Sequence, residues 1–365
     1  MKMSIPFVVS PSTGSGRTVM ASAGRASTGV DGDTRTGAGR TAITVIVALL
    51  IFGGNAHAQV RSRGAAADYP SKPIRFVVPS SPGGGADALA RSLGPKLAES
   101  FGQPVVIENR AGAGGIIGYE IVAKAPADGY TMLVVAGGYT LNPSLYTKLP
   151  YDTLNDFERV SLIACAPNLL VVHSSVPVNS VQELIAYARA KPKFLNYASS
   201  GVGTTSYLSA EIFKSKTGVD IVHVPYKGAG ESTSAVIAGQ VHLIFSTPNA
   251  LMPQAKAGRV RALGVTSARR LPVIPDVPTI AESGVAGYEV NNCYGILVPA
   301  KTPPAIVATL NGDIVRILRA PATRNLIESL GFEVLGTTSA QYTAFAKADL
   351  AKWAKELKVA GIQPQ

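Results

Sequence analysis

Residues 74–87 read Ile-Arg-Phe-Val-Val-Pro-Ser-Ser-Pro-Gly-Gly-Gly-Ala-Asp, and this stretch decides the fold. Its first five residues are mostly apolar and rich in β-branched side chains, which predicts a strand that ends at Pro79. A helix is predicted over about residues 86–100, because leucines recur there every four residues. The glycine-rich turn therefore joins a buried strand to the N-terminus of an amphipathic helix, an arrangement typical of α/β folds.

The same alternation of apolar runs and helical periodicity continues to the C-terminus. Further strands are predicted at residues 105–108, 130–136, 169–173, 195–198, 221–224, 241–245, 260–265 and 291–298. Further helices are predicted at residues 116–125, 184–190, 204–216, 233–238, 248–257, 306–318, 324–330 and 339–360. Such alternation predicts mostly parallel sheets covered by helices.

Two lobes are predicted from the position of two apolar runs, at residues 169–173 and 291–298. The segment between them repeats the strand and helix pattern independently. We therefore predict a lobe 2 (residues 171–290) inserted into a discontinuous lobe 1 (residues 69–170 plus 291–365). The chain would cross between the lobes near residues 170 and 290, and the C-terminal helices would return to lobe 1. A ligand cleft is expected between the lobes.

Residues 1–58 carry the pattern of a secretory signal peptide. The first 40 residues hold five basic side chains against two acidic ones, and an apolar run over residues 42–52 follows. Ala56-His57-Ala58 then provides a cleavage site with small residues at both ends. The apolar run reaches about half of the ~20 residues that a transmembrane anchor needs. We therefore predict export and cleavage after Ala58.

The composition restricts the class of protein. Hydrophobic residues make up 46% of the 365 residues and charged residues 16%, which excludes extensive disorder. The formal net charge of +11 is compatible with nucleic acid, an anionic membrane or an anionic ligand. Basic residues do not cluster with aromatic ones, and a DNA-binding regulator would need a helix-turn-helix and a cytoplasmic address. We therefore expect no nucleic-acid partner, and the charge fits an anion receptor or simple solubility.

Cys165 and Cys293 are the two cysteines of the chain. Export would allow a disulfide to persist. Each cysteine nevertheless lies in an apolar, strand-like run, and the sequence does not show that the two are close. We therefore predict two free, buried thiols, with a disulfide as the alternative.

Glycine-rich and hydroxyl-rich turns follow strands in both predicted lobes. Residues 79–87 in lobe 1 and 196–205 in lobe 2 each lead from a strand into a helix. Free N–H groups and hydroxyls at a helix N-terminus favour a carboxylate, although plain tight turns and N-caps use the same residues. Residues 136–143 and 224–230 form two further turns of this kind. Turns that face each other across a cleft would form an anion site.

Catalytic and metal-binding motifs are not found. The histidines are His57, His173, His223 and His242, and neither the spacing of a zinc site nor a G-x-S-x-G motif occurs. We predict no enzyme activity, no metal and no cofactor. A secreted serine hydrolase of small esters is the alternative, and it would need His223 or His242 beside Ser81 or Ser200.

Several motifs occur together and in order from about Tyr69 to the C-terminus. They are YPSKPIR (69–75), PGGGAD (82–87), ENRAGAGG (108–115), ADGYT (127–131), NYASSGVGT (196–204), VPYKG (224–228) and PDVPT (275–279). In this combination the chain resembles the tripartite tricarboxylate transporter substrate-binding family, the Bug receptors. The resemblance implies a type II-like periplasmic-binding-protein fold and a monomer in the periplasm. It also implies capture of a di- or tricarboxylate, an aromatic acid or an amino acid for a membrane permease. A sensor-type receptor without its own permease is a further alternative.

The resemblance also implies which loops hold the ligand. Carried onto this chain, the candidate ligand-binding residues are Ser81, Gly83, Ala86, Asp87, Tyr139, Asn142, Ser200, Gly201, Thr204, Tyr226 and Lys227. His242 joins this set because the family usually carries an acid at its position. Cys293 is a second departure, since the family commonly has Trp there. His242 in place of an acid removes a negative charge near lobe 2, and the loss of the indole at Cys293 changes the packing of the cleft wall or the hinge. A surface residue without ligand contact is the alternative for His242.

Overall fold

Two separate β-sheets organise residues 69–364, the part of the chain that this computed structural model describes. The first sheet has six strands in the order β11-β4-β10-β3-β1-β2. These strands are β1 (Ile74–Val78), β2 (Val105–Asn109), β3 (Thr131–Val135), β4 (Phe157–Pro167), β10 (Asn291–Pro299) and β11 (Glu333–Val334). The predicted signal peptide, residues 1–58, lies outside the described residues.

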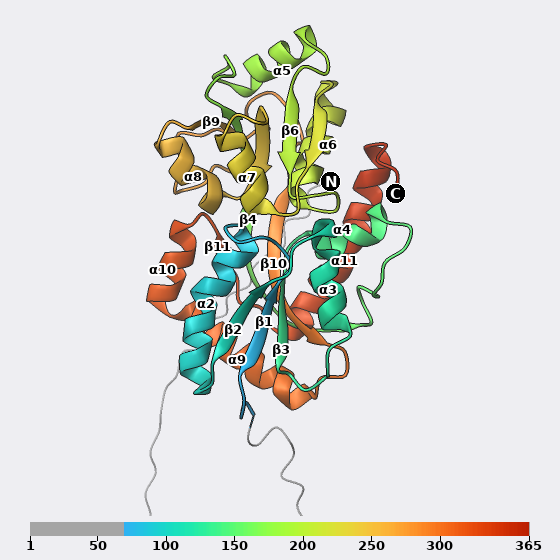
Figure 1. The fold of residues 1–365 in the computed structure, drawn as a ribbon, viewed down its shortest axis with the longest axis vertical. Coiled ribbons are helices and arrows are strands. Elements are labelled where there is room, and N and C mark those ends of the chain that lie inside the picture. Colours follow the sequence, from blue (N-terminus) through green and yellow to red (C-terminus); the bar gives the residue numbers. More distant parts are fainter. Residues whose placement is uncertain (1–68, 365) are drawn as a thin grey trace, which may run out of the picture. The chain divides into compact units, whose positions relative to one another are not determined.

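The second sheet has five strands in the order β7-β6-β8-β5-β9. These strands are β5 (Leu169–His173), β6 (Asn196–Ser199), β7 (Val222–Pro225), β8 (Leu243–Ser246) and β9 (Val260–Val265). Figure 1 shows the two sheets with their own helices, so each forms a separate α/β layer structure. The prediction of two α/β lobes is confirmed, and we keep the names lobe 1 and lobe 2 for the first and second sheet with their helices.

Helices cover both sheets (Figure 1). Lobe 1 has α2 (Gly85–Phe101), the 3-10 turn η1 (Ala113–Gly115), α3 (Ile116–Ala123), α4 (Gly138–Leu145), α9 (Pro304–Arg319), α10 (Pro321–Ser329) and α11 (Ser339–Val359). Lobe 2 has α5 (Val181–Ala190), α6 (Thr205–Thr217), α7 (Ala229–Ile237) and α8 (Pro248–Lys256). Among residues 69–364, none of these helices combines the length and the apolar character that crossing a bilayer requires.

The opening strand and helix form as their sequence pattern predicts. Leu89, Leu93 and Leu97 of α2 are completely buried, because their spacing places them on one face of the helix. That face packs into the same apolar cluster as Ile74 and Phe76 of β1. The turn between β1 and α2 is thereby held at one end of the sheet, facing lobe 2.

The chain passes between the lobes at two neighbouring places. β4 ends at Pro167 and β5 begins at Leu169, so Asn168 is the first crossing point. On the return path, Thr266 donates its backbone N–H to the Asn168 carbonyl, and Val290 donates to the Thr266 carbonyl, each at 2.9 Å. The two crossing segments are therefore bonded to each other. The lobe boundaries at residues 171 and 290 stay a prediction.

The expectation of mostly parallel sheets is wrong. β1 pairs in parallel with β2 and β3, and β6 with β7 and β8, but β10 is antiparallel to β3 and β4, and β5 is antiparallel to β8 and β9. β10 and β5 are the main cause, because each arrives from the other lobe and so runs against its neighbours, and the short strand β11 is also antiparallel to β4. Sequence analysis also missed β4 and α4, whose Pro143 lies inside a short helix.

Cys165 and Cys293 form a disulfide, so the prediction of two free thiols is wrong. The two residues are 128 positions apart in the sequence. They lie directly opposite each other in the antiparallel pair of β4 and β10, which the missed strand β4 had concealed. Antiparallel pairing brings the two side chains within bonding reach.

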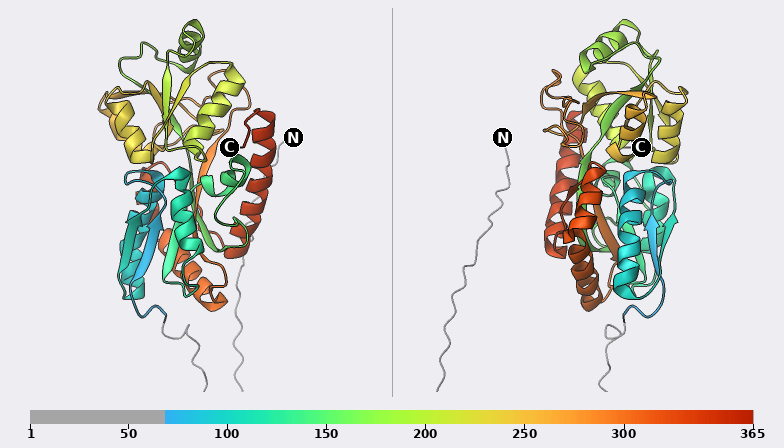
Figure 2. Two further views of the ribbon diagram at one scale, coloured as in Figure 1. Left: turned by 45° about the vertical axis from the view of Figure 1, so that its right-hand side comes forward. Right: turned by 90° about the vertical axis from the view of Figure 1, so that its left-hand side faces the viewer.

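The last helix reaches beyond the lobe on which it begins. α11 packs on α4 and β4 of lobe 1, as predicted. Its later residues Trp353 and Leu357 are buried in the cluster that also contains Tyr207 and Leu208 of α6. Both views in Figure 2 show α11 running alongside lobe 1 toward the level of lobe 2. The helix therefore adds an apolar contact between the lobes.

Candidate functional site

A cavity of about 70 Å³ lies between the two lobes. Lobe 1 lines it with Pro79, Ser80, Gly84, Gly85, Ala86, Gly114, Gly115, Tyr119, Ala136, Gly138, Asn292 and Tyr294. Asn168 at the crossing point also lines it, and lobe 2 contributes Ser200, Thr204, Thr205, Ser206, Lys227, Gly228, Ala229, Ser246 and Thr247. A water needs about 10–15 Å³ by this kind of measure, so the cavity has room for only a small molecule or part of one.

Helix N-termini from both lobes meet at this cavity. α2 and α4 of lobe 1, and α6, α7 and α8 of lobe 2, each place first-turn or N-cap residues in the wall. The N-caps Gly84 of α2 and Gly228 of α7 lack a side-chain capping bond within the described chain. The first N–H groups of a helix have no partner inside the helix and carry a partial positive charge. Their convergence favours an anion in the cavity.

Two buried hydroxyls in the wall are unpaired. Neither Ser80 Oγ in lobe 1 nor Thr247 Oγ1 in lobe 2 has a hydrogen-bond partner among residues 69–364. Leaving a buried polar group unpaired costs about 1–3 kcal/mol. Because one hydroxyl comes from each lobe, a polar guest between them would remove both penalties at once.

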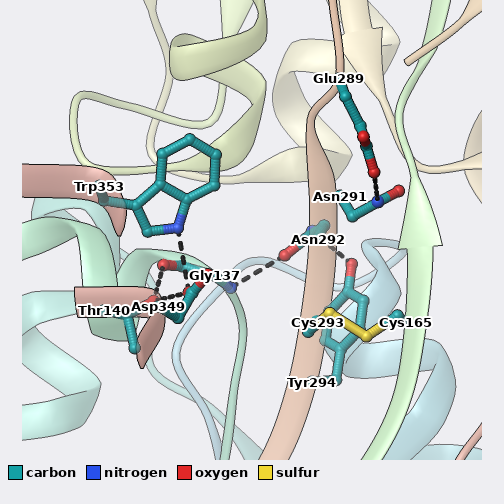
Figure 3. Close-up of a disulfide and its surroundings, with 10 residues drawn as sticks. All are labelled: Gly137, Thr140, Cys165, Glu289, Asn291, Asn292, Cys293, Tyr294, Asp349 and Trp353. Atoms are coloured by element: carbon teal, nitrogen blue, oxygen red, sulfur yellow. Dashed lines mark hydrogen bonds between the residues drawn. A yellow bond between two sulfur atoms is a disulfide. The ribbon is translucent and has the colours of Figure 1, made fainter. Parts of the chain in front are cut away.

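Strand β10 supplies a further polar pair. Asn292 Oδ1 accepts the backbone N–H of Gly137 at 2.9 Å, and Asn292 Nδ2 donates to Tyr294 Oη at 2.6 Å (Figure 3). Burial raises the pKa of Tyr294 far above its usual value, so the phenol is neutral. Since its oxygen already accepts from Asn292, its O–H can donate to a molecule in the cavity.

The charge of the wall has one sign. Lys227 is the only charged side chain among the described residues that line the cavity, and it lies at the exposed rim. The wall thus combines main-chain N–H groups, hydroxyls and one ammonium group, with no carboxylate. Such a set of donors suits a carboxylate oxygen.

Direct contacts between the lobes surround the cavity. Tyr146 Oη of lobe 1 donates to the Val202 carbonyl of lobe 2 at 3.0 Å, and Asn249 Nδ2 donates to the Gly83 carbonyl at 3.3 Å. Gly114 (φ 61°) lies so close to the Val202 carbonyl that a Cβ at residue 114 would collide with it. The turns from the two lobes therefore meet backbone to backbone.

Four of the twelve predicted site residues line the cavity. They are Ala86, Ser200, Thr204 and Lys227. Gly201 and Tyr226, again with Lys227, line an adjoining open groove of about 490 Å³ between Tyr146 and Glu231. Six residues of the predicted set therefore line the cavity or the groove beside it, and the two share Gly114 and Lys227.

The other six lie outside the wall. Ser81 and Gly83 form contacts between the lobes. Asp87 accepts hydrogen bonds from Arg91, Gly83 and Asn109, and so stabilises its own turn. Burial alone would raise the pKa of Asp87, but these hydrogen bonds lower it below its usual value. Contacts of these residues with a ligand stay a prediction.

Tyr139 lies in the interior of lobe 1, whereas Asn142 lies where lobe 1 meets Gly203 of lobe 2, and its buried Oδ1 has no partner among the described residues. Tyr139 donates to the Thr153 carbonyl, and Asn142 Nδ2 donates to Tyr151 Oη at 3.1 Å. His242 bonds to Asn196 and lies against the Phe194 ring, just before β8 begins, whereas the cavity touches Ser246 at the other end of that strand. Burial, together with His173, lowers the pKa of His242.

Several residues of the wall were missed from the sequence. Ser80 follows β1 and Thr247 follows β8, so both stand at carboxyl ends of strands, where α/β folds bind ligands. That rule could have identified them. Asn292 and Tyr294 gave no such signal, because they lie within a strand of the opposite direction.

The histidine needed for a hydrolase has another partner. His223 Nε2 lies 2.6 Å from the Oγ of Ser199, which is completely buried, and its ring stacks on Tyr197. Ser81 Oγ instead accepts the N–H of Gly230.

Within residues 69–364, no group of three His, Cys, Asp or Glu side chains is placed to hold a metal ion.

Comparison with known proteins identifies the family. Residues 89–362 match the model of the tripartite tricarboxylate transporter family receptor. A UPF0065 protein in the tcbD-tcbE intergenic region of Pseudomonas sp. strain P51 is 39% identical over 288 residues, which cover 79% of this chain and 86% of that protein.

Solved structures give the same result. A protein of R. palustris solved with adipate is 40% identical, with a TM-score of 0.79 over 81% of this chain and 100% of the other. MatC from Rhodopseudomonas palustris with bound malate is 32% identical, with a TM-score of 0.76 over 79% and 99%. The chain therefore belongs to the tripartite tricarboxylate transporter receptor family, whose members are periplasmic solute-binding proteins.

Proposed function

We propose that the cavity binds the carboxylate of a small organic acid. The observation that carries this proposal is the pair of unpaired buried hydroxyls, Ser80 Oγ and Thr247 Oγ1, one in each lobe. A carboxylate offers two acceptor oxygens, so it can accept from a hydroxyl of each lobe while the helix N-termini stabilise its charge. Burying an ionised group is tolerable only when its oxygens are hydrogen-bonded.

The size of the cavity and the comparisons support a small aliphatic acid. A volume of about 70 Å³ accommodates a carboxylate and a short stem. The open groove beside it, with Tyr226 and Lys227, gives a longer acid somewhere to extend. The related proteins were solved with adipate and malate, which are both small aliphatic dicarboxylic acids.

The composition of the wall supports binding without chemistry. The described residues that line the cavity include no histidine, aspartate or glutamate, so the wall holds no carboxylate or imidazole to act as a general base. We infer that the protein delivers its ligand unchanged to the membrane components of a tripartite transporter. Export by cleavage after Ala58 and action as a monomer complete the proposal.

Ligand binding is tested with the mature chain, beginning at Gln59. Thermal unfolding and calorimetric titration against mono-, di- and tricarboxylates should give a rise in Tm and a measurable Kd for at least one acid. Thr247→Val should weaken the binding of that acid by at least about tenfold, since a hydrogen bond to a charged group is lost, worth about 1.5–3 kcal/mol. Ser80→Ala should also weaken the binding of that acid.

Thr233→Val is the matched control. Thr233 Oγ1 is also buried and unpaired among residues 69–364, but it does not line the cavity. This variant should leave Kd unchanged. A flat response to every acid, accompanied by turnover of a chromogenic ester, would instead favour the hydrolase.

A further inference from the structure

The disulfide joins the two strands that cross between the lobes. At the end of the ladder between β4 and β10, the opposed pairs are Pro167 with Asn291, Ala166 with Asn292, and Cys165 with Cys293. β4 continues into lobe 2 through Asn168, and β10 comes from lobe 2 through Val290. The crosslink therefore sits in the third pair from the point where both strands leave the sheet.

The same crosslink lies behind the cavity wall. Cys293 stands between Asn292 and Tyr294, which both line the cavity, whereas Cys293 lines other pockets. Side chains alternate between the faces of a strand, so the sulfur points away from the cavity that its neighbours face. Figure 3 shows the disulfide between β4 and β10, with Asn292 reaching Gly137 and Tyr294 from the next positions.

The pairing of β4 with β10 is irregular next to the disulfide, although β11 also pairs with β4 at Cys165 and Ala164. The register between β4 and β10 shifts between Tyr294 and Gly295, and again between Ile296 and Leu297. A bulge interrupts the ladder of hydrogen bonds between β4 and β10 just beyond the terminal pairs. The covalent bond fixes these terminal pairs, and with them the position of Asn292.

The disulfide is open to reagents from the side opposite the cavity. Both cysteines are half-buried and line a broad groove of about 830 Å³, together with Ser267, Arg269 and Phe332. A thiolate can attack a disulfide sulfur only when it can reach it. The groove provides that access without opening the lobes.

We propose that the Cys165–Cys293 disulfide is a redox-modifiable site whose reduction weakens ligand binding in the cavity. A dithiol reductant supplies two electrons and two protons. Its thiolate attacks one sulfur to form a mixed disulfide, its second thiol then displaces that sulfur, and the products are two cysteine thiols and a cyclic disulfide. The effect on affinity rests on the proposed function, while the effect on the strands does not.

The first experiment needs no ligand. Hydrogen exchange of the mature protein is compared in the oxidised form, in the form reduced with dithiothreitol, and in Cys165→Ser/Cys293→Ser. The amides of Gly137 and of residues 291–294 should exchange faster in the reduced form and in the variant. Residues of β6 and β8, at the centre of the lobe 2 sheet, should not change. Equal exchange in all forms overturns the proposal.

The second experiment measures the Kd of adipate and of malate for the same three forms. We expect about a fivefold rise on reduction, the factor that corresponds to one hydrogen bond. Reoxidation should restore the Kd, and dithiothreitol should have no effect on the double variant. Equal Kd values in the oxidised and reduced forms overturn this proposal alone. A flat titration of the oxidised protein overturns the proposed function, and with it the effect on affinity.

Discussion

Gly230 of lobe 2 donates its backbone N–H to the Oγ of Ser81 in lobe 1, at 3.1 Å. The donor lies in the first turn of α7, and the acceptor lies in the turn that leads from β1 into α2. Both turns continue directly into the cavity wall, at Ala229 and at Ser80. This contact between the lobes is thus adjacent in the chain to the groups that would hold the ligand.

Ser81→Ala should weaken ligand binding by about fivefold, because the closed arrangement loses one hydrogen bond, worth about 1 kcal/mol. Calorimetric titration with the best acid of the panel measures the change. Ser92→Ala is the control, since its Oγ bonds to the Ala88 carbonyl within α2 and not across the lobes. An unchanged Kd for Ser81→Ala would show that this contact does not support closure.

Gly114→Ala should prevent the lobes from meeting. Its Cβ would collide with the Val202 carbonyl, which belongs to the backbone and cannot move aside cheaply. We expect a loss of affinity of at least about tenfold, corresponding to 1.4 kcal/mol or more. Titration of the variant checks this expectation.

Gly102→Ala separates the collision from backbone strain. Gly102 has nearly the same backbone angles as Gly114 (φ 62°, ψ 16° against φ 61°, ψ 21°), and no described atom lies within 4 Å of its added Cβ. Both variants should lose about 1–2 kcal/mol of stability through left-handed strain. If Gly102→Ala weakens binding as much as Gly114→Ala, the steric explanation is wrong.

Stability should fall as the solution is made mildly acidic. Burial lowers the pKa of His223 below its usual value of 6.5, with Glu211 opposing and Lys214 adding to the shift. The unfolded chain therefore binds this proton at a higher pH than the folded chain does, so the free energy of unfolding decreases as pH drops below about 6.5. Denaturant titrations between pH 5 and pH 8 measure the slope.

His223→Gln should reduce that slope. His242 also has a lowered pKa and acts with the same sign, so the double variant with His242→Gln should reduce the slope further. A slope that is identical in the wild type and the double variant would assign the acid sensitivity to other groups.

The disulfide should contribute substantially to stability. It closes a loop of 128 residues, and removing a native disulfide typically costs about 2–5 kcal/mol. Cys165→Ser/Cys293→Ser should lower the free energy of unfolding by that amount in a denaturant titration. A loss of less than about 0.5 kcal/mol in the free energy of unfolding would mean that strand pairing alone holds the ends of β4 and β10 together.

Elements with a regular pattern could be predicted from the sequence, and those held by distant contacts could not. The leucines of α2 and the apolar run of β9 each carry a periodicity or a composition that is local. α4 lacks such a signal because it contains a proline, and the apolar run of β4 does not reveal that this strand pairs with β10. The disulfide could not be predicted for the same reason, since it depends on that pairing.

The candidate site shows the same division. Ala86, Ser200 and Thr204 were found because they stand where a strand leads into a helix. His242 was included only through the family resemblance, and it precedes the amino end of β8, whereas the cavity lies at the carboxyl end of that strand. Asn292 and Tyr294 reach the wall only through the crossing strand.

The need for a negative charge is the central claim, and comparing an acid with its uncharged methyl ester tests it most directly. Calorimetric titration of the mature chain with adipate, malate and their uncharged dimethyl esters should give a Kd for at least one acid. The dimethyl ester of that acid should bind roughly a hundredfold more weakly, a difference of about 2.7 kcal/mol. Acid and ester that bind equally well, or esters that bind more tightly, would contradict an anion site formed by helix N-termini and hydroxyls.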